Sequence, residues 1–328
     1  MNSLHDISRR YQKLPCLRSP GWFHLNLGDE SIYGRRISQL AIGNNVMLNV
    51  VTDVRNFPLE SFGRYFEAVS AFVINNKTAC IYGVGVIVLT TCSYTLLRDI
   101  RKRIFVWVSS KSDKIRDEKK YEQFRLKLVA PLKSIVSHDP ALRKEKNIRI
   151  LEIGVGCGDN LKHYPDGAHL VLVDPNPHFK QHFTKKLTGN LKINPEDIIV
   201  SKGEDMDVVP SESVDAVVVS LVLCSVTDVS KVLRQVKRVL VPGGKFLFME
   251  HVHEWDTKTY RARRIIQSLL TVTRIWPFLF EGCILNRDPL PLIRAAGFSQ
   301  VKAEYLYAPI LCTVFKVGSP HVIGEATK

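Results

Sequence analysis

Short apolar runs recur along the second half of the chain, and polar segments separate them. The runs at residues 150–153, 171–173, 198–201 and 213–220 are mostly aliphatic, and the last is apolar at nearly every position. Continuous apolar strands are typical of parallel sheets, which helices cover on both faces. The pattern therefore predicts an α/β, doubly wound, mostly parallel sheet that begins near residue 147.

The last part of the chain predicts the other end of this sheet. A turn at 241–245 contains Pro242, Gly243 and Gly244 and leads into a fifth strand at 246–249. A helix at 289–296 follows later. Two further strands near 301–307 and 321–326 then bring the sheet to seven, and we expect them to form its antiparallel end.

The amino-terminal part of the chain predicts a membrane anchor. Residues 78–97 carry no charge, and 20 such residues can cross a hydrocarbon core of about 30 Å as a helix. Arg98, Arg101, Lys102 and Arg103 follow at once, which places the carboxyl side in the cytosol. The apolar patch at 104–108 suits an interfacial anchor. A buried helix of a soluble core is the alternative for 78–97.

These boundaries divide the chain into four parts. Residues 1–77 form an amino-terminal extension of unknown structure, and 78–108 form a transmembrane or monotopic anchor. Residues 109–146 are predicted as a basic helical linker, and 147–328 as the α/β domain. Arg9 and Arg10 near the amino terminus resemble part of a mitochondrial presequence, so a mitochondrial location is the alternative. Asp6 argues against it, because such presequences contain few acidic residues.

The net charge of +14 is concentrated next to the predicted anchor. Residues 98–146 contain 15 Lys or Arg and 7 Asp or Glu. A basic face beside an apolar anchor is typical of proteins that contact anionic lipid headgroups. Basic patches also bind nucleic acid, but the sequence shows no nucleic-acid-binding module. We therefore expect membrane lipids as partners, no nucleic acid, and a monomer.

A glycine-rich loop follows the first predicted strand. Its glycines stand on alternate residues, 154, 156 and 158, and Glu152 precedes them. The dinucleotide fingerprint would need a further glycine at position 159, which is Asp159. The spacing instead resembles the loop with which class I methyltransferases hold S-adenosylmethionine. Glu152 would accept a hydrogen bond in this loop or from the cofactor's ammonium, and Gly154, Gly156 and Gly158 would let the backbone approach the methionine part.

More candidate cofactor-binding residues stand at the ends of the following strands. Asp174 and Pro175 follow the second strand, where a carboxylate can bind both ribose hydroxyls. Glu204 and Asp205 follow the third strand, where the adenine amino group would lie. Leu221 follows the fourth strand and completes the predicted S-adenosylmethionine site.

The methyl acceptor should lie beyond the fourth and fifth strands, because ligands bind at the carboxyl ends of such sheets. His251 is the candidate general base for an oxygen acceptor, or else a structural histidine at a strand end. A thiol acceptor needs less help, because part of it is already ionised near neutral pH. Cys224, just beyond the fourth strand, is the second candidate catalytic residue. The seven cysteines form no Cys-x-x-Cys motif, and no histidine stands at a spacing suited to zinc. We therefore expect free thiols and no metal.

Residues 255–281 are more apolar than a surface connection should be. They suit a lid over an apolar substrate, or a second membrane contact assisted by Arg261, Arg263 and Arg264. Ordinary packing against the sheet is the alternative.

From residue 151 onward, the chain resembles one family, the membrane-anchored thiol S-methyltransferases of endoplasmic reticulum and lipid droplets. The most specific matching segments are Leu-Val-Leu-Cys-Ser-Val at 221–226 and Phe-Met-Glu-His-Val at 248–252. Two features depart from the family. The loop has Cys157 where the family carries threonine, and 77 residues precede an anchor that the family has at its amino terminus.

The resemblance implies a Rossmann-like class I methyltransferase fold and S-methylation of small lipophilic thiols. It also implies a location on the cytosolic face of the endoplasmic reticulum or lipid droplets. Two alternatives stay open from the residues. The acceptor could be a lipophilic oxygen or ring carbon, as in a quinone, or the chain could be a cofactor-binding lipid-droplet protein without turnover.

Overall fold

The computed structural model describes residues 67, 69–111, 115–189 and 192–328, and the chain divides into two units, Met1–Lys77 and Thr78–Lys328. The predicted extension of residues 1–77 therefore lies largely outside the described residues. Everything below concerns the second unit and the helix that opens it, α3 (Lys77–Ser109).

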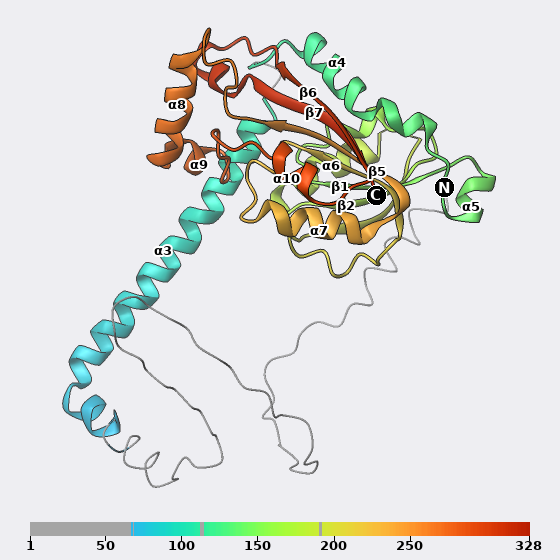
Figure 1. Ribbon diagram of the computed structural model, residues 1–328. Coiled ribbons are helices and arrows are strands. Elements are labelled where there is room, and N and C mark those ends of the chain that lie inside the picture. The colour runs from blue at the N-terminus through green and yellow to red at the C-terminus, as the bar shows by residue number, and fades with distance from the viewer. Residues whose placement is uncertain (1–66, 68, 112–114, 190–191) are drawn as a thin grey trace, which may run out of the picture. The chain divides into compact units, whose positions relative to one another are not determined.

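A seven-stranded sheet forms the centre of the domain (Figure 1), with the strand order β3-β2-β1-β4-β5-β7-β6. The strands are β1 (Arg149–Ile153), β2 (His169–Val173), β3 (Asn194–Ile199), β4 (Val214–Ser220), β5 (Leu240–His251), β6 (Gln300–Tyr307) and β7 (Pro320–Thr327). The first five are parallel, and β7 is antiparallel to both β5 and β6. This is the predicted class I methyltransferase fold, with its antiparallel end where the sequence places it.

Helices cover both faces of the sheet (Figure 1). They are α4 (Glu118–Val129), α5 (Pro140–Lys144), α6 (Lys180–Leu187), α7 (Val229–Val239), α8 (Arg261–Val272), α9 (Ile275–Leu279) and α10 (Leu290–Ala295). Alternate residues of β4 enter different cores: Val217 and Val219 pack with α7 and α10, whereas Ala216 and Val218 pack with α4 and α6. Successive side chains of a strand point to opposite faces, so a continuous apolar run serves both cores.

α7 shows how the sequence specifies one of these helices. Asp228 is its N-cap and accepts a hydrogen bond from the Lys231 backbone N–H. Such a cap satisfies one of the free donors of the first turn. The buried residues recur at helical spacing and line the side that faces the sheet: Val229, Val232, Leu233, Val236 and Val239.

The predicted linker is helical, but it packs into the core of the domain. Tyr121 and Leu128 of α4 are buried against the sheet. Asp215 of β4 joins this segment to the strands, because its carboxylate accepts hydrogen bonds from the Ser137 hydroxyl at 2.7 Å and the His138 backbone N–H at 2.8 Å. Charges of both signs alternate along this segment, a pattern typical of a solvated helix, so no local pattern predicts this packing.

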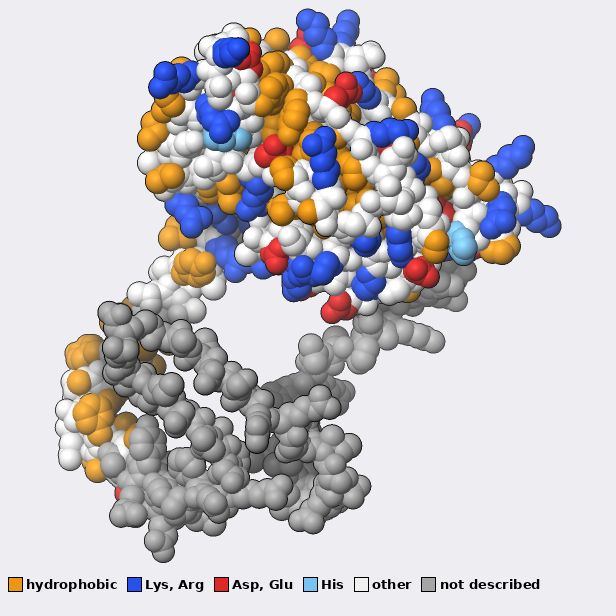
Figure 2. Space-filling view, viewed as in Figure 1, with side chains coloured by type: hydrophobic (Ala, Val, Ile, Leu, Met, Phe, Trp, Pro, Cys, Tyr) orange, Lys and Arg blue, Asp and Glu red, His pale blue; other side chains and the backbone are white. Residues whose placement is uncertain are grey.

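α3 consists of two parts with different surroundings. It is long and apolar enough to cross a membrane, and the most apolar part of the helix is not buried. The large hydrophobic side chains of this most apolar part, such as Ile87 and Leu89, are exposed (Figure 2). Near its carboxyl end, Val106 is buried, Phe105 packs edge-on against Phe179, and His178 bonds Asp99 at 2.6 Å. Part of the patch predicted as an interfacial anchor therefore belongs to the domain.

Candidate active site

The glycine loop after β1 adopts backbone angles that favour glycine. Gly154, Gly156 and Gly158 have φ angles of 74°, 54° and 73°, a region that other residues rarely adopt. A Cβ on Gly154 would overlap the side chain of Val222, whereas a Cβ on Gly156 would meet nothing within 4 Å. Gly156 therefore borders open space, as a backbone that receives a ligand should.

Asp174 connects the end of β2 to this loop. Its carboxylate accepts a hydrogen bond from the Gly156 backbone N–H at 2.9 Å and from the Asn176 N–H at 2.8 Å. Burial raises the pKa of Asp174 to about 6, although these two bonds act in the opposite direction. The carboxylate thus stands beside the loop at the end of β2, where the sequence predicts the ribose contact.

Glu152 lies beneath the loop and does not border the cavity described below. It is fully buried, and its Oε1 accepts a hydrogen bond from the Asn160 side chain at 2.8 Å. Burial raises the pKa of Glu152 to about 7. Of the two roles predicted for Glu152, the structure shows a hydrogen bond within the loop region.

Glu204 and Asp205 are engaged away from the glycine loop. Glu204 accepts a hydrogen bond from the Thr227 backbone N–H at 2.8 Å, and Asp205 pairs with Lys231 at 2.6 Å. Neither is among the described residues that line the cavity. Their predicted contact with adenine stays a prediction. Pro175 and Leu221, by contrast, both line the cavity.

A cavity of about 360 Å³ joins the glycine loop to the ends of β4 and β5. Gly156, Cys157 and Asp174 line one part of it, and Cys224 and His251 another. Five aromatic side chains from α3, the turn before α6 and the segments after β5 form part of its other walls: Phe105, Phe179, Trp276, Phe280 and Phe315. The cavity therefore places apolar side chains close to the glycine loop and the Asp174 carboxylate.

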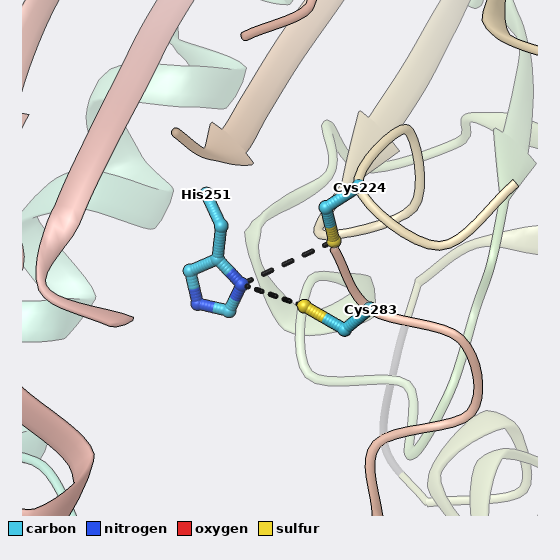
Figure 3. Close-up of side chains that lie close together, drawn as sticks. All are labelled: Cys224, His251 and Cys283. Atoms are coloured by element: carbon cyan, nitrogen blue, oxygen red, sulfur yellow. Dashed lines mark hydrogen bonds between the residues drawn. The ribbon is translucent and has the colours of Figure 1, made fainter. Parts of the chain in front are cut away.

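The two predicted catalytic residues meet a third side chain, Cys283. The His251 Nδ1 lies 3.6 Å from the Cys283 Sγ and 4.0 Å from the Cys224 Sγ (Figure 3). Glu250 fixes the loop that carries Cys224, because its buried carboxylate accepts the backbone N–H groups of Val222, Leu223 and Cys224. All three members of the cluster line the cavity.

The cluster shifts the titration of its members. The hydrogen bond between the two thiols, and then burial, raises the pKa of Cys224 well above its usual range. The same bond and His251 hold the pKa of Cys283 well below its usual range. Burial acts to lower the pKa of His251, but the contact with Cys283 outweighs it, and the pKa is raised. Burial also raises the pKa of Cys157 to about 11, so its thiol is neutral at physiological pH.

A group of charged residues holds α4 over the glycine loop, and the sequence did not reveal it. Asp159, directly after the loop, accepts hydrogen bonds from Arg116 at 3.0 Å and from Arg125 at 2.9 Å. Arg125 is itself almost fully buried and also bonds Glu118 at 2.6 Å. The only signal in the sequence was a charged residue at the position where a dinucleotide fingerprint would place glycine.

Residues 151–248 match the family described as a methyltransferase domain. The chain is 38% identical over 182 residues to thiol S-methyltransferase TMT1A of Homo sapiens, an alignment that covers 55% of this chain and 71% of that protein. It is 36% identical over 213 residues to thiol S-methyltransferase TMT1B of Mus musculus, which covers 65% and 82%. The chain belongs to this thiol S-methyltransferase family.

Among solved structures, the chain is similar to a protein of Thermotoga maritima described as an S-adenosylmethionine-dependent methyltransferase and possible histamine N-methyltransferase. The two are 17% identical with a TM-score of 0.39, and the match covers 55% of this chain and 82% of the other.

Membership of the family confirms the predicted methyltransferase activity and, with it, S-adenosylmethionine as the cofactor. The glycine loop fits this cofactor, because Gly156 leaves open space beside it and Asp174 stands next to that space. The identity of the acceptor and the roles of single residues are separate questions.

Proposed function

We propose that the protein methylates the sulfur of small lipophilic thiols at the cytosolic surface of a membrane, in endoplasmic reticulum or lipid droplets. The observation that supports this proposal best is the continuous cavity between the glycine loop and the Cys224–His251–Cys283 cluster. Its aromatic walls favour an apolar acceptor. Membership of the thiol S-methyltransferase family supports sulfur as the atom that is methylated.

The residues at the loop end of the cavity would hold the cofactor, which supplies a methyl group on a sulfonium. The Asp174 carboxylate would accept hydrogen bonds from the ribose hydroxyls, and Gly156 would let the backbone approach the methionine part. Pro175 and Leu221 would form apolar contacts beside them. Glu152 would act indirectly, because its carboxylate accepts a hydrogen bond from the side chain of Asn160, which lines the cavity.

The residues at the acceptor end would orient a thiol toward the methyl group. Methyl transfer depends mainly on placing the nucleophile in line with the methyl carbon. The backbone bonds of Glu250 keep the 222–224 loop in one conformation. Trp276 and Phe280 exclude water, which strengthens the electrostatic interactions between reacting groups.

Two surfaces support action at a membrane. The exposed part of α3 presents apolar side chains such as Ile87 and Leu89, at 64% and 69% exposure. A second apolar surface lies on α8 and α9, and Arg101 of α3 contacts it through the Phe278 carbonyl and ring. A lipophilic acceptor dissolved in the bilayer would therefore concentrate close to the cavity. Arg263 and Arg264, predicted to assist a membrane contact, bond the side chain and the backbone carbonyl of Glu254. Their bonds therefore stabilise the fold.

A turnover assay with labelled S-adenosylmethionine tests the proposal. The full chain in liposomes receives panels of lipophilic thiols, phenols and quinones, and Asp174→Asn serves as the matched control with impaired cofactor binding. We expect labelled thioethers from the wild-type protein and little product from the control. Product from phenols or quinones alone would replace thiols by an oxygen or carbon acceptor. Cofactor binding without product from any panel would identify a non-catalytic protein.

A further inference from the structure

Three side chains that can bind a soft metal ion meet in the cavity wall. Cys224 follows β4, His251 ends β5, and Cys283 follows α9 (Figure 3). Their nearest ligand atoms all lie within 4.8 Å of one another. Both sulfur atoms contact the same ring nitrogen, Nδ1 of His251, at 3.6 and 4.0 Å. Three donors that point toward one common space form the geometry of a metal site.

The two sulfur–nitrogen distances are close to those of a tetrahedral zinc site. Zinc binds thiolate sulfur at about 2.3 Å and imidazole nitrogen at about 2.0 to 2.1 Å, so the sulfur and nitrogen atoms of such a site stand about 3.6 Å apart. The contact between Cys283 and His251 has this length, and the Cys224 contact is 0.4 Å longer. A small movement of one side chain would complete the geometry.

We propose that Cys224, His251 and Cys283 bind one Zn²⁺ ion and leave its fourth position open to the cavity. Two thiolates and one imidazole are a donor set used by catalytic zinc sites, which keep one position for water or substrate. Soft sulfur ligands exclude Mg²⁺ and Ca²⁺, which prefer oxygen. The cavity extends from the cluster toward Gly156 and Asp174, so the fourth ligand can come from a bound substrate.

The surrounding residues hold the three donors in place. Glu250 fixes the backbone of Cys224. Gly282, with a φ of 93°, allows the chain to turn directly before Cys283, and a Cβ there would lie 3.1 Å from the Ser225 carbonyl oxygen. His321 packs edge-on against the His251 ring, with ring centres 4.7 Å apart. Rigid support of this kind is what a metal site needs.

This inference rests on the proposed function for its role, because the open position suits a thiol. The S–H bond of the acceptor breaks as its sulfur binds the ion, and the proton passes to water. A lone pair of that sulfur then attacks the methyl carbon of S-adenosylmethionine. The new sulfur–carbon bond forms while the bond from the methyl group to the sulfonium breaks, and the thioether and S-adenosylhomocysteine leave.

Metal content tests the site directly and independently of turnover. The full chain is purified in detergent under reducing conditions without chelator, and zinc is measured by inductively coupled plasma mass spectrometry. We expect about one zinc ion per chain in the wild type. Cys224→Ser and Cys283→Ser should lose most of it, whereas Cys312→Ser, a cysteine outside the cavity wall, should retain it. Retained S-adenosylmethionine binding shows that the variants are folded.

A second measurement avoids the variants. Wild-type protein stripped of metal is titrated with Co²⁺, which should produce the absorption of a tetrahedral, thiolate-bound ion. The metal site would be overturned if the wild type contained no zinc and showed no such absorption after reconstitution. A zinc content in Cys283→Ser equal to that of the wild type would also overturn it. So would a Cys224–Cys283 disulfide that persists under reducing conditions. Thiol turnover by a metal-free protein would overturn the zinc role alone. Zinc without thiol turnover would instead overturn the proposed acceptor.

Discussion

Asp174 lines the cavity beside the glycine loop, and its carboxylate is the group proposed to bind the ribose of S-adenosylmethionine. Burial raises its pKa to about 6, and only the ionised form accepts hydrogen bonds from both ribose hydroxyls. We therefore expect the affinity for S-adenosylmethionine to fall below about pH 6, by up to about tenfold for each pH unit. Isothermal titration calorimetry of the purified protein measures this.

The control for this pH dependence is Asp174→Asn. Loss of a charge-assisted contact costs about 1.5 to 3 kcal/mol, or roughly 10- to 150-fold in affinity at neutral pH. The variant should also bind with the same affinity on both sides of pH 6. A wild-type affinity that does not change between pH 5 and 7.5 would remove Asp174 from the ribose site.

Glu152 gives a prediction about stability. Its pKa is raised from 4.5 to about 7 in the folded protein, so folding favours the protonated form. This contribution is fully present below pH 4.5 and is lost as the pH rises through about 7. Glu152→Gln removes the titration. The free energy of unfolding of the wild type relative to the variant should therefore fall by up to roughly 3 kcal/mol between pH 5 and 8.5.

Thermal unfolding of both proteins without cofactor, at a series of pH values, measures this difference. Curves that stay parallel across the series would show that Glu152 titrates normally.

The sequence identified some site residues and missed others, depending on how local their signal was. The glycines on alternate residues and Asp174 belong to a compact pattern after two strands, and the structure places them together. Cys283 lies 32 residues beyond His251, in a segment whose path no periodicity predicts. Its contact with His251 therefore required the folded chain.

At the scale of elements, α3 combines two parts with different surroundings in one continuous helix. Its amino-terminal part is exposed and apolar. Its last turns contribute Phe105 and Val108 to the cavity wall and Val106 to the core. Because α3 is one continuous helix, its exposed apolar part is directly connected to the wall of the cavity.

Two deletions test the separate roles proposed for these two parts. Removal of residues 78–97 should move the protein from the carbonate-washed membrane pellet to the soluble fraction while S-adenosylmethionine binding persists. Removal of 78–109 should also abolish that binding, because the cavity loses Phe105 and the core loses Val106. Fractionation and calorimetry measure the two outcomes. Persistence of the shorter deletion in the pellet would show that another surface anchors the chain.

The elements of the sheet were predictable because apolar runs, glycine turns and acids at strand ends recur in order. The placement of α4 was not. Its buried residues, Tyr121, Arg125 and Leu128, stand among alternating charges, a pattern that usually indicates a solvated helix. Long-range contacts of Arg125 with Asp159, and of Asp215 with Ser137, fix this region, and neither pair has a local signature.

At the scale of the whole domain, α8 and α9 extend the apolar surface next to α3. Leu269, Val272 and Phe278 are 58%, 76% and 63% exposed. Both helices lie near the carboxyl end of α3 (Figure 1), where Arg101 contacts Phe278. Soluble domains rarely expose so many apolar side chains together unless the surface meets a partner or a membrane.

A surface of this kind should affect lipophilic substrates alone. In the protein that lacks residues 78–97, Val272→Glu combined with Phe278→Glu should weaken binding to liposomes. The same two substitutions should raise KM severalfold for a thiol dissolved in the bilayer. The reason is that each apolar side chain removed from the membrane loses about 1.5 to 3 kcal/mol of transfer free energy. KM for a water-soluble thiol should not change. Val136→Glu is the matched control, because Val136 is also exposed, at 73%. Val136 precedes Ser137, which bonds Asp215 near the start of β4. This end of the strands is opposite to the end that borders the cavity. Equal effects on both thiols would show that the substitutions damage the cavity itself, and no effect on either would remove α8 and α9 from the membrane surface.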